Sequence, residues 1–378
     1  MSAILPGATL GILGGGQLGR MTAMAARPLG YHVHVLDPDA SCAARFVVER
    51  CITANFDDDF AAADLARHCA VVTLEIEKIS AASMNAVVRY APARPGGGVL
   101  AIIQDRGRQR QWLARHGFPT VDWRLAESVE ALAAAIAELG PGCFVKSCTG
   151  GYDGRGQARP ASPADAASVW AALGAGPCVV ERAVELAAEL SVLVARTPSG
   201  RVAVHPVAQN HHVAQVLAWS VIPAPLPAET LRDAEEIARG VADALHIEGL
   251  LVVELFLDHD GKLRVNELAP RPHNSFHATE VGCVTSQFEQ AVRAVCDLPL
   301  GSTEIVRPAA IHNLLGDLWD GGRTPRFERA LEIPGVRVHL YGKRVARPGR
   351  KMGHLSALGA TPDDAAARVL EAWRRVQD

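Results

Sequence analysis

The chain lacks paired cysteines, and this absence excludes two kinds of site. Its eight cysteines stand singly along 378 residues, with no Cys-x-x-Cys pair among them. Neither a cysteine-based zinc site nor a disulfide framework is therefore indicated. A secretory signal and an apolar stretch long enough to span a membrane are also missing. We expect a cytoplasmic protein with reduced thiols and no membrane partner.

Strong charge of either sign is missing as well. The formal net charge is −3, which argues against a nucleic-acid partner. Apolar residues make up 49% of the chain and charged residues 21%, an ordinary balance for a soluble enzyme. No internal repeat or low-complexity segment stands out. A chain of 378 residues is too long for one core, so we expect two or three domains.

The N-terminal segment has the pattern of a strand, a glycine turn, a helix and a second strand. A buried strand is expected over residues 8–13, the turn at Gly14–Gly19, and a second strand over residues 32–37 that ends in Asp37. This βαβ pattern is typical of dinucleotide-binding folds. A helix N-terminus binds any anion, so the pattern indicates either a nicotinamide dinucleotide or a sugar phosphate.

Acidic residues follow the next expected strand, over residues 71–77. In open α/β sheets, ligands gather outside the C-terminal ends of the strands. Glu75 or Glu77 would therefore contact a substrate. Without further support, both are equally compatible with ordinary loop acids.

A lysine and a glycine cluster indicate a phosphate site in the middle of the chain. Residues 143–146 predict a strand that ends at Lys146, and a loop with four glycines follows over residues 149–156. Glycines let backbone N–H groups approach phosphates closely, and Lys146 would add a charge. A flexible hairpin loop is the alternative. Tyr152, Asp153 and Arg155 favour the phosphate site, because a mere turn does not need them.

Two distant glutamates predict a magnesium site. Residues 249–257 predict a buried strand, and Asp260-Gly261 is a strong hairpin turn signal. If His259 faces Lys262 across that turn, Glu254 lies opposite Glu267. Facing carboxylates repel each other and need a cation or a shared proton. Mg²⁺ fits, because it takes carboxylates, substrate phosphates and water, and Asn266 adds an oxygen ligand. The alternative is a solvated edge with two unrelated glutamates.

The remaining segments predict a smaller α/β unit and a basic loop. A helix is expected over residues 128–139, a capped helix start at Ser162–Asp165, and strands over residues 177–181 and 189–196. An edge that begins at Glu181 would pair with adenine through its backbone. Residues 341–354 are strongly basic; such a run is usually a solvated face, but Pro348 and Gly349 suggest a loop shaped for a phosphate. The histidines are compatible with zinc, but no cysteine or acid spacing supports it.

Together these motifs resemble one family. Gly14–Met21, Gly150–Gly156, Asn266–Ser275 and Arg350–His354 are similar to the 5-(carboxyamino)imidazole ribonucleotide synthases, which are ATP-grasp ligases of purine biosynthesis. The resemblance runs nearly end to end. It implies an α/β ATP-grasp fold with an N-terminal Rossmann-like domain over residues 1–103, a small α+β lid over 104–193 and a C-terminal ATP-grasp domain over 194–378. It also implies a homodimer.

The resemblance implies a definite reaction. ATP phosphorylates bicarbonate to carboxyphosphate, which delivers carbon dioxide to the exocyclic amine of aminoimidazole ribonucleotide. The cofactors are ATP and Mg²⁺, and the partners are small molecules. A water-free closed site would protect carboxyphosphate from hydrolysis.

The resemblance also implies four groups of site residues. The metal ligands are Glu254, Asn266 and Glu267. The residues that would contact the ribonucleotide are Gln17, Leu18, Glu75, Tyr152, Lys343, Arg350 and Lys351. The residues expected at the reacting groups are Lys146, Asp153, Arg155, Arg271 and Asn274. The residues expected to bind ATP are Arg106, Lys146, Gly151, Tyr152, Asp153, Gly154, Arg155, Gly156, Gln157, Glu181, Arg182, Ala183, Val184, Glu189, His212, Asn266 and Glu267.

Five positions depart from the family pattern. Cys148 replaces a common arginine, Gln209 an acid, Gln215 a glycine, Lys78 an asparagine and Phe276 a glycine. The metal ligands and the phosphate loop are intact, so activity is expected.

Three alternatives stay open at this point. A sibling ATP-grasp enzyme would use formate or carry out another carboxylation. A nicotinamide oxidoreductase would leave Glu254, Glu267 and the lysine loop without a role. A non-catalytic nucleotide sensor is compatible with the five departures.

Overall fold

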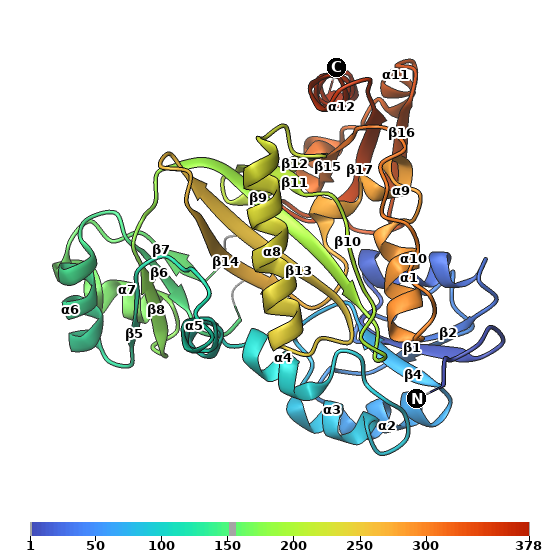
Figure 1. Cartoon of the computed structure of the whole chain (residues 1–378), viewed down its shortest axis with the longest axis horizontal. Coiled ribbons are helices and arrows are strands. Elements are labelled where there is room, and N and C mark those ends of the chain that lie inside the picture. The colour runs from blue at the N-terminus through green and yellow to red at the C-terminus, as the bar shows by residue number, and fades with distance from the viewer. Residues whose placement is uncertain (1, 151–155, 378) are drawn as a thin grey trace.

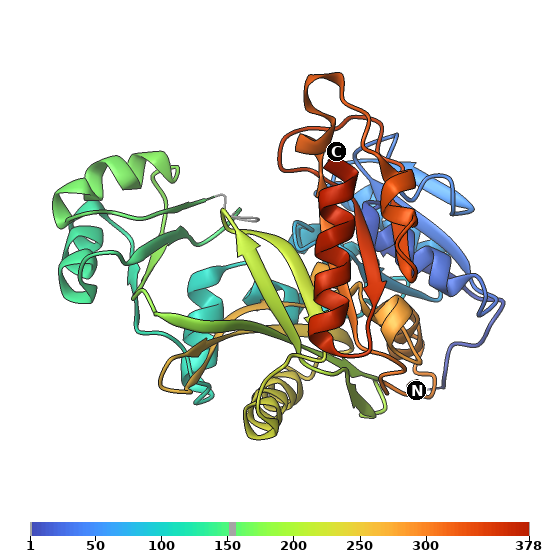
Figure 2. The same ribbon diagram turned by 90° about the horizontal axis from the view of Figure 1, so that it is seen from above.

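Three β-sheets organise the chain, and each gathers its strands from a different stretch of sequence (Figure 1). The structure is a computed structural model that describes residues 2–150 and 156–377. The small sheet and its helices project from the rest of the molecule, as the view from above shows (Figure 2). The other two sheets lie beside each other.

The N-terminal sheet is parallel and has the strand order β3-β2-β1-β4. Its strands are β1 (Thr9–Leu13), β2 (His32–Asp37), β3 (Arg50–Thr53) and β4 (Val71–Leu74), and its helices are α1 (Gln17–Ala26), α2 (Asp59–Arg67), α3 (Ala81–Val87) and α4 (Gly97–Ile103). The expected βαβ unit is present. Strand β4 ends earlier than expected, so Glu75 follows it directly. Parallel pairing of β1 with β4 brings Gly14 and Glu75 to the same edge of the sheet.

The small sheet is antiparallel, with the order β5-β8-β6-β7. Its strands are β5 (Trp123–Ala126), β6 (Phe144–Ser147), β7 (Gln157–Ala158) and β8 (Cys178–Glu181). The helical elements around it are α5 (Arg106–Arg115), α6 (Val129–Leu139), η1 (Pro163–Asp165) and α7 (Ala166–Ala172). Ser128 caps α6, and Ser162 begins η1 with a capping box, as the sequence predicts. Lys146 lies on β6 and pairs with Gln157, the first residue of β7.

The large sheet is antiparallel, with the order β14-β13-β9-β11-β12-β15-β17-β16, and β10 pairs with β9. Its strands are β9 (Leu186–Arg196), β10 (Val202–Val204), β11 (Ala208–Val213), β12 (Val216–Ile222), β13 (Gly249–Asp258), β14 (Leu263–Ala269), β15 (Ala309–Leu315), β16 (Val336–Leu340) and β17 (Lys351–Leu358). Its helical elements are α8 (Ala228–Ala244), η2 (Asn274–Phe276), α9 (Thr279–Gly282), α10 (Gln287–Val295), η3 (Gly316–Gly322), α11 (Phe327–Leu331) and α12 (Pro362–Gln377). The expected C-terminal helix begins after Thr361, whose hydroxyl accepts from the Asp364 N–H.

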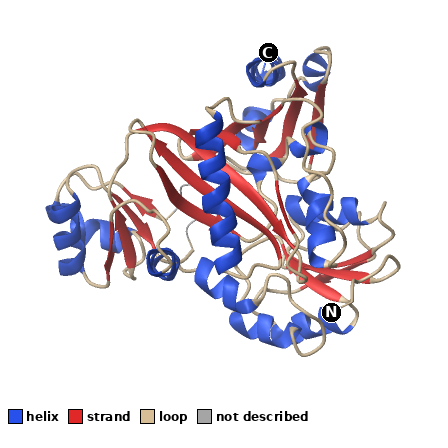
Figure 3. Cartoon of the chain, in the orientation of Figure 1, coloured by secondary structure: helices blue, strands red, loops and turns tan. Residues whose placement is uncertain are grey.

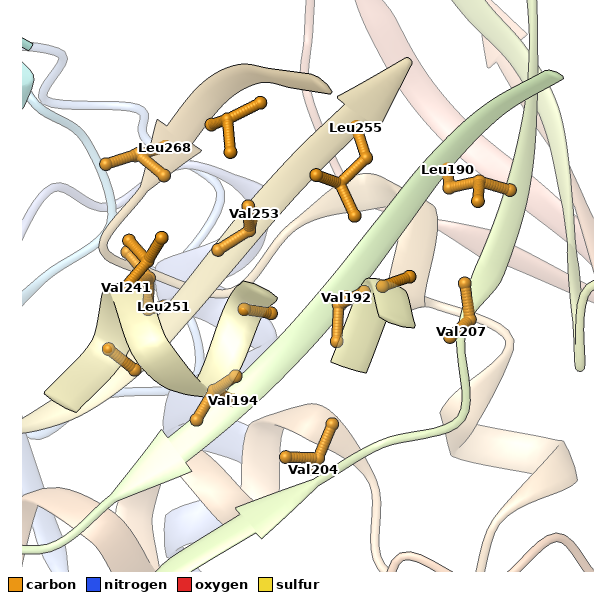
Figure 4. Packing of buried hydrophobic residues seen from close by; sticks show 14 of the residues in the cluster. Leu190, Val192, Val194, Val204, Val207, Val241, Leu251, Val253, Leu255 and Leu268 are labelled. Carbon is orange, nitrogen blue, oxygen red and sulfur yellow. The ribbon is translucent and has the colours of Figure 1, made fainter. Parts of the chain in front are cut away.

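The centre of the large sheet is covered on both faces. Helix α8 lies across one face of the long strands β9 and β13 (Figure 3). Alternate residues such as Val192 and Val253 point toward it and are fully buried with Val241 (Figure 4). The intervening residues, Leu193 and Val252 among them, pack on the other face. Burial on both faces explains the near-continuous apolar run over residues 249–257 and gives β13 a rigid position. Within the described residues, no helix has the length and apolar character needed to cross a membrane.

We predict that Leu251→Ala lowers the free energy of unfolding by about 2–5 kcal/mol, because Leu251 is fully buried under α8 and its loss leaves a cavity. Urea unfolding monitored by circular dichroism measures the change. The matched control is Leu5→Ala, where the side chain is 65% exposed and the change should stay within about 0.5 kcal/mol. Equal effects of the two substitutions would contradict this description of the core.

Candidate active site

Two carboxylates face each other at the edge of the large sheet. Glu254 of β13 is paired with Glu267 of β14 in the strand register, as the sequence predicts. A β-bulge lies between Glu254 and Leu255, and Asn266 is the extra residue on β14. Since a bulge re-aims side chains locally, Asn266 also reaches the pair: its Nδ2 lies 3.4 Å from Glu254 Oε2. The bulge thus gathers three oxygen-bearing side chains.

The turn that joins the two strands differs from the expected one. His259 does not face Lys262. Instead, the Asp258 N–H donates to the Lys262 carbonyl, and Leu257 pairs with Leu263. This register alone would have moved Glu254 off Glu267 by one residue. The bulge adds that residue back, so the predicted pairing of the carboxylates is correct although the predicted turn was wrong.

Glu254 and Glu267 repel each other when both are ionised and no cation binds them. Burial and the charge of Glu267 raise the pKa of Glu254 to about 7. His273 Nε2 lies 3.4 Å from Glu254 Oε1, and Arg106 Nη2 lies 3.4 Å from Glu267 Oε2. The Asn266 Oδ1 atom is buried and has no hydrogen-bond partner among the described residues. Two carboxylates and an unpaired amide oxygen form a set of hard oxygen donors, which fits Mg²⁺.

A buried cluster of cations lies on the small-sheet side. Lys146 Nζ lies 2.5 Å from Glu181 Oε2, and Arg110 Nη2 lies 2.6 Å from Glu181 Oε1. Burial would raise the pKa of Glu181, but Arg110 and Lys146 outweigh it and hold the pKa below its usual range. Burial lowers the pKa of Lys146, and Glu181 opposes that shift. The cluster carries net positive charge, as a triphosphate site requires.

Arg110 is a site residue that the sequence interpretation missed. Its side chain is fully buried, and its Nη1 also donates to the Val265 carbonyl of β14 over 2.7 Å. It therefore links the small sheet to the strand that carries Asn266 and Glu267. The available signal was its spacing from Arg106, because residues four apart lie on one face of a helix.

The expected adenine edge needs a correction. Strand β8 does not lie at an edge, because Glu181 pairs with Trp123 of β5 on one side and with Phe144 of β6 on the other. The chain leaves the sheet after Glu181, and the Arg182 N–H donates to the Asp122 carbonyl. Ala183 and Val184 follow outside the ladder, in the segment between β8 and β9. The sequence pattern did not reveal that a third strand would cover β8.

The residues expected near the ribose lie together. His212 Nδ1 lies 3.0 Å from Glu189 Oε2. Burial lowers the pKa of His212, but Glu189 outweighs it and raises the pKa above its ordinary value. A bulge in β11 between His211 and His212 accompanies this arrangement.

The predicted phosphate loop is described only at its ends. Gly151, Tyr152, Asp153, Gly154 and Arg155 lie outside the described residues. Gly156 has a positive φ of 71°, and its carbonyl accepts from the Ser147 N–H over 2.8 Å. Gln157 donates from its amide to Gln215 in the β11–β12 turn, so the end of the loop contacts the large sheet.

The glycine turn of β1 and the basic C-terminal segment meet as expected. Lys343 Nζ donates to Gln17 Oε1 over 2.8 Å and to the Lys351 carbonyl over 2.7 Å. The side chain of Leu18 packs with Tyr341 in a small apolar cluster, so only its backbone is available to a ligand. Arg350 Nη1 donates to the Val345 carbonyl within the same loop.

Glu75 lies at the N-terminus of α1, where a phosphate was expected. Its carboxylate accepts from the Gly16 and Gly19 N–H groups. Gly14 has a φ of 108°, and a Cβ there would lie 2.3 Å from the Glu75 side chain, so only glycine fits. Asp37 accepts from the Gly15 N–H over 2.7 Å. The acid at the end of β2 therefore holds the turn, which removes the main support for a nicotinamide site.

The segment after β14 supplies two more predicted residues. Arg271 Nε lies 2.8 Å from Glu77 Oε1, so this loop acid is tied to the site. Asn274 is buried, and within residues 2–150 and 156–377 its Oδ1 atom has no hydrogen-bond partner. His273, which was not singled out, contacts Glu254 from the same segment.

Two of the five departures, Cys148 and Phe276, are buried side chains. Cys148 is buried, and its carbonyl accepts from the Arg106 N–H over 2.8 Å, which fixes the start of α5. Burial raises the pKa of its thiol to about 11, so it supplies no charge. Phe276 is fully buried in the core under the large sheet. Gln215 adopts a positive φ of 68°, a conformation that favours glycine.

The candidate site is separate from a cavity of about 470 Å³ between α4 and the end of α8. Among the described residues, none of the predicted site residues line that cavity. The candidate site is instead defined by its charged side chains.

Comparisons with known proteins agree with this arrangement. Residues 7–104 match the ribonucleotide synthetase preATP-grasp domain, residues 111–288 the ATP-grasp domain, and residues 309–368 the phosphoribosylaminoimidazole carboxylase C-terminal domain. With the sheets described above, these matches define an ATP-grasp ligase with an N-terminal preATP-grasp domain.

The similarity extends to whole proteins. The N5-carboxyaminoimidazole ribonucleotide synthase of Brucella melitensis is 41% identical over 94% of this chain and 98% of that protein. The ADP complex of an N5-carboxyaminoimidazole ribonucleotide synthetase has a TM-score of 0.93 at 39% identity and covers 100% of both chains. The Aspergillus clavatus enzyme in complex with ADP and 5-aminoimidazole ribonucleotide has a TM-score of 0.89 at 32% identity, over 98% of each chain. The chain belongs to the N5-carboxyaminoimidazole ribonucleotide synthase family.

Family membership confirms the fold, the enzyme class and the activity expected from the sequence. The chain is an ATP-grasp ligase of purine biosynthesis, and ATP-dependent carboxylation of aminoimidazole ribonucleotide is the activity of its family. The formate-using sibling, the nicotinamide oxidoreductase and the non-catalytic sensor are not favoured.

We predict that Glu254→Gln stabilises the ligand-free, metal-free enzyme at about pH 8 by on the order of 1–3 kcal/mol, because the raised pKa of Glu254 makes its ionised form costly. The folded-state pKa lies above the unfolded one, so the penalty is absent at low pH and grows as pH rises through 4.5 toward 7. The difference should therefore vanish below about pH 4. Urea unfolding in the presence of a chelator measures it, with Glu236→Gln on the exposed side of α8 as the control. A pH-independent difference would contradict the account.

Proposed function

We propose that this chain carboxylates 5-aminoimidazole ribonucleotide with bicarbonate and ATP, and that the described side chains divide the work among three neighbouring groups. The observation that carries the proposal is the facing of Glu254 and Glu267, with Arg106 in contact with Glu267 and Lys146 in contact with Glu181. Carboxylates and cations at this spacing suit a metal-bound triphosphate, and the family resemblance supports the same assignment.

Lys146 and Arg106 bind the phosphates of ATP in this proposal. Their side chains are only 13% and 17% exposed, and both are already held in place by carboxylates, Glu181 and Glu267. Fixed cations cost little reorganisation when charge moves between phosphoryl oxygens, which favours phosphoryl transfer. Glu189 and His212 lie farther along the large sheet and suit the ribose.

Glu254, Glu267 and Asn266 hold Mg²⁺ in this proposal. When bound, the ion would supply positive charge that neutralises part of the charge of the ATP phosphates. Two observations support this assignment. The buried Asn266 Oδ1 atom has no hydrogen-bond partner in the described part of the chain, and the pKa of Glu254 is raised, so a cation would stabilise both groups.

The chemistry proceeds in two stages. A bicarbonate oxygen takes the γ-phosphoryl group, which gives ADP and carboxyphosphate. Carboxyphosphate then releases phosphate and carbon dioxide, and the exocyclic amine of the ribonucleotide attacks the carbon dioxide. Arg271 and Asn274, next to the carboxylates, suit the bicarbonate and imidazole side. Asp153 and Arg155, which lie outside the described residues, are assigned to the same side by resemblance alone.

The ribonucleotide phosphate binds between the turn at Gln17 and the basic loop in this proposal. Lys343 already joins the two segments through Gln17. Lys351 and Arg350 add positive charge, and the backbone of Leu18 adds a donor at the start of α1. Glu75, which accepts from that helix in the ligand-free protein, must then share or yield its donors.

Other expectations stay predictions. These are the domain boundaries after residues 103 and 193, the homodimer and the cytoplasmic location. Analytical ultracentrifugation tests the dimer, and limited proteolysis tests the boundaries.

We predict that Lys146→Ala lowers ATP turnover by at least about a hundredfold, because it removes a charge from the phosphates. Release of ADP in the presence of bicarbonate and ribonucleotide measures it. Lys262→Ala, in the exposed β13–β14 turn, should leave turnover unchanged. Near-normal turnover of the Lys146 variant would count decisively against the assignment.

We predict that Arg350→Ala raises KM for aminoimidazole ribonucleotide about tenfold, the loss of roughly one charge-assisted hydrogen bond, and leaves KM for ATP nearly unchanged. Steady-state kinetics with each substrate varied in turn measure both constants. Arg374→Ala on the surface of α12 is the control. An unchanged ribonucleotide KM would refute the role of Arg350.

The broadest test compares ADP release with both co-substrates, with either one omitted, and with formate in place of bicarbonate. The proposed reaction requires rapid release only when ribonucleotide and bicarbonate are both present. Release that depends on formate, or that ignores the ribonucleotide, would overturn the proposed function.

A further inference from the structure

Two thiols lie in contact behind the glycine turn of the N-terminal sheet. Cys42 Sγ and Cys51 Sγ are 3.7 Å apart. Cys51 belongs to β3, where it pairs with Val35 of β2, and Cys42 lies in the segment between those strands. Since a disulfide has a sulfur–sulfur distance of about 2.05 Å, the two sulfurs need to approach by less than the width of one atom.

The two thiols differ in access and reactivity. Cys51 is half-buried, whereas Cys42 is only 5% exposed. The hydrogen bond with Cys42 and the positive charge of Arg45 lower the pKa of Cys51 to about 7. The same hydrogen bond, together with burial, raises the pKa of Cys42. A thiolate forms most readily at the more accessible sulfur, and a second thiol stands next to it, which is the usual arrangement of a redox-sensitive pair.

The buried thiol touches the turn that begins α1. A Cβ at Gly15 would lie 2.6 Å from Cys42 Sγ, so backbone and sulfur are in direct contact. The same segment is bonded to the turn and its helix: the Ala44 N–H donates to the Gly15 carbonyl over 2.8 Å, and Arg20 Nη1 donates to the Ala43 carbonyl over 3.0 Å. Movement of Cys42 toward Cys51 would therefore displace Gly15 and the turn that carries Gln17.

We propose that Cys42 and Cys51 form a reversible disulfide when the protein meets hydrogen peroxide, and that this modification weakens ribonucleotide binding at the glycine turn. The second half of the proposal rests on the proposed function, because it takes the turn at Gln17 as part of the ribonucleotide site. The first half does not depend on it. A transient disulfide of this kind is compatible with a reducing compartment, where regulatory disulfides form and are reduced again.

The chemistry balances with the peroxide as the oxidant. The Cys51 thiolate attacks one peroxide oxygen and becomes a sulfenic acid, and hydroxide leaves. The Cys42 sulfur then displaces the sulfenic hydroxyl group and forms the S–S bond, and its proton leaves with that group as water. In total, two thiols lose two electrons and two protons, and the peroxide is reduced to two molecules of water. A thiol reductant such as dithiothreitol reverses the change by exchange.

The first experiment detects the bond directly. The reduced, desalted full-length protein is treated with hydrogen peroxide, its remaining thiols are alkylated with iodoacetamide, and peptides are analysed by mass spectrometry without reduction. We expect a linked peptide pair that contains Cys42 and Cys51 and that disappears after dithiothreitol. Alkylation of both cysteines after peroxide treatment, or irreversible sulfinic acid without a linked pair, would overturn the proposal.

The second experiment measures the consequence. We expect peroxide to raise KM for the ribonucleotide several-fold with KM for ATP unchanged, and dithiothreitol to restore it. Cys42→Ser should have ordinary activity and show no peroxide effect. Cys69→Ser is the matched control. Burial raises the pKa of the Cys69 thiol to about 12, and Cys69 takes no part in the proposed disulfide. A linked pair with unchanged kinetics would refute the effect on ribonucleotide binding. The mass readout does not require turnover, so it separates failure of the thiol chemistry from failure of the proposed function.

Discussion

The facing of Glu254 and Glu267 is the constraint on which the rest of the site depends. Two carboxylates are held opposite each other on strands that are hydrogen-bonded into the largest sheet, and burial of Glu254 makes its charge beside Glu267 costly. The rigid core under α8 prevents β13 from relaxing. The repulsion is therefore relieved by a proton or by a cation. A site of this kind binds a metal–phosphate complex in preference to a neutral ligand.

Arg110 connects this constraint to the small sheet. Its guanidinium group bonds both Glu181, which holds Lys146, and the Val265 carbonyl, one residue from the bulge. Arg110 thereby fixes the position of Lys146 relative to the carboxylates of β13 and β14, although these residues belong to different sheets. Loss of one partner would leave a buried charge uncompensated, which is more costly than the gain from the pair itself.

Sequence patterns predicted much of this arrangement, because local rules govern it. Helix caps at Ser128 and Thr361, the βαβ start and the apolar strand around Glu254 follow from short-range chemistry. Contacts between segments that are distant in the sequence do not follow from short-range chemistry. The position of β8 between two strands, the contact of Glu75 with the start of α1 and the burial of Arg110 depend on which segments meet in space. The bulge at Asn266 shows the limit most clearly, since it corrected a turn register that residue counting had placed wrongly.

The most direct test of the account is anomalous X-ray diffraction from a crystal that contains Mn²⁺ and a non-hydrolysable ATP analogue. Manganese takes the oxygen ligands that magnesium takes, and its anomalous signal marks its position. The account predicts a peak within bonding distance of the Glu254 and Glu267 carboxylates, with phosphate oxygens completing the shell. A nucleotide bound beside carboxylates that point apart, with no ion between them, would contradict it.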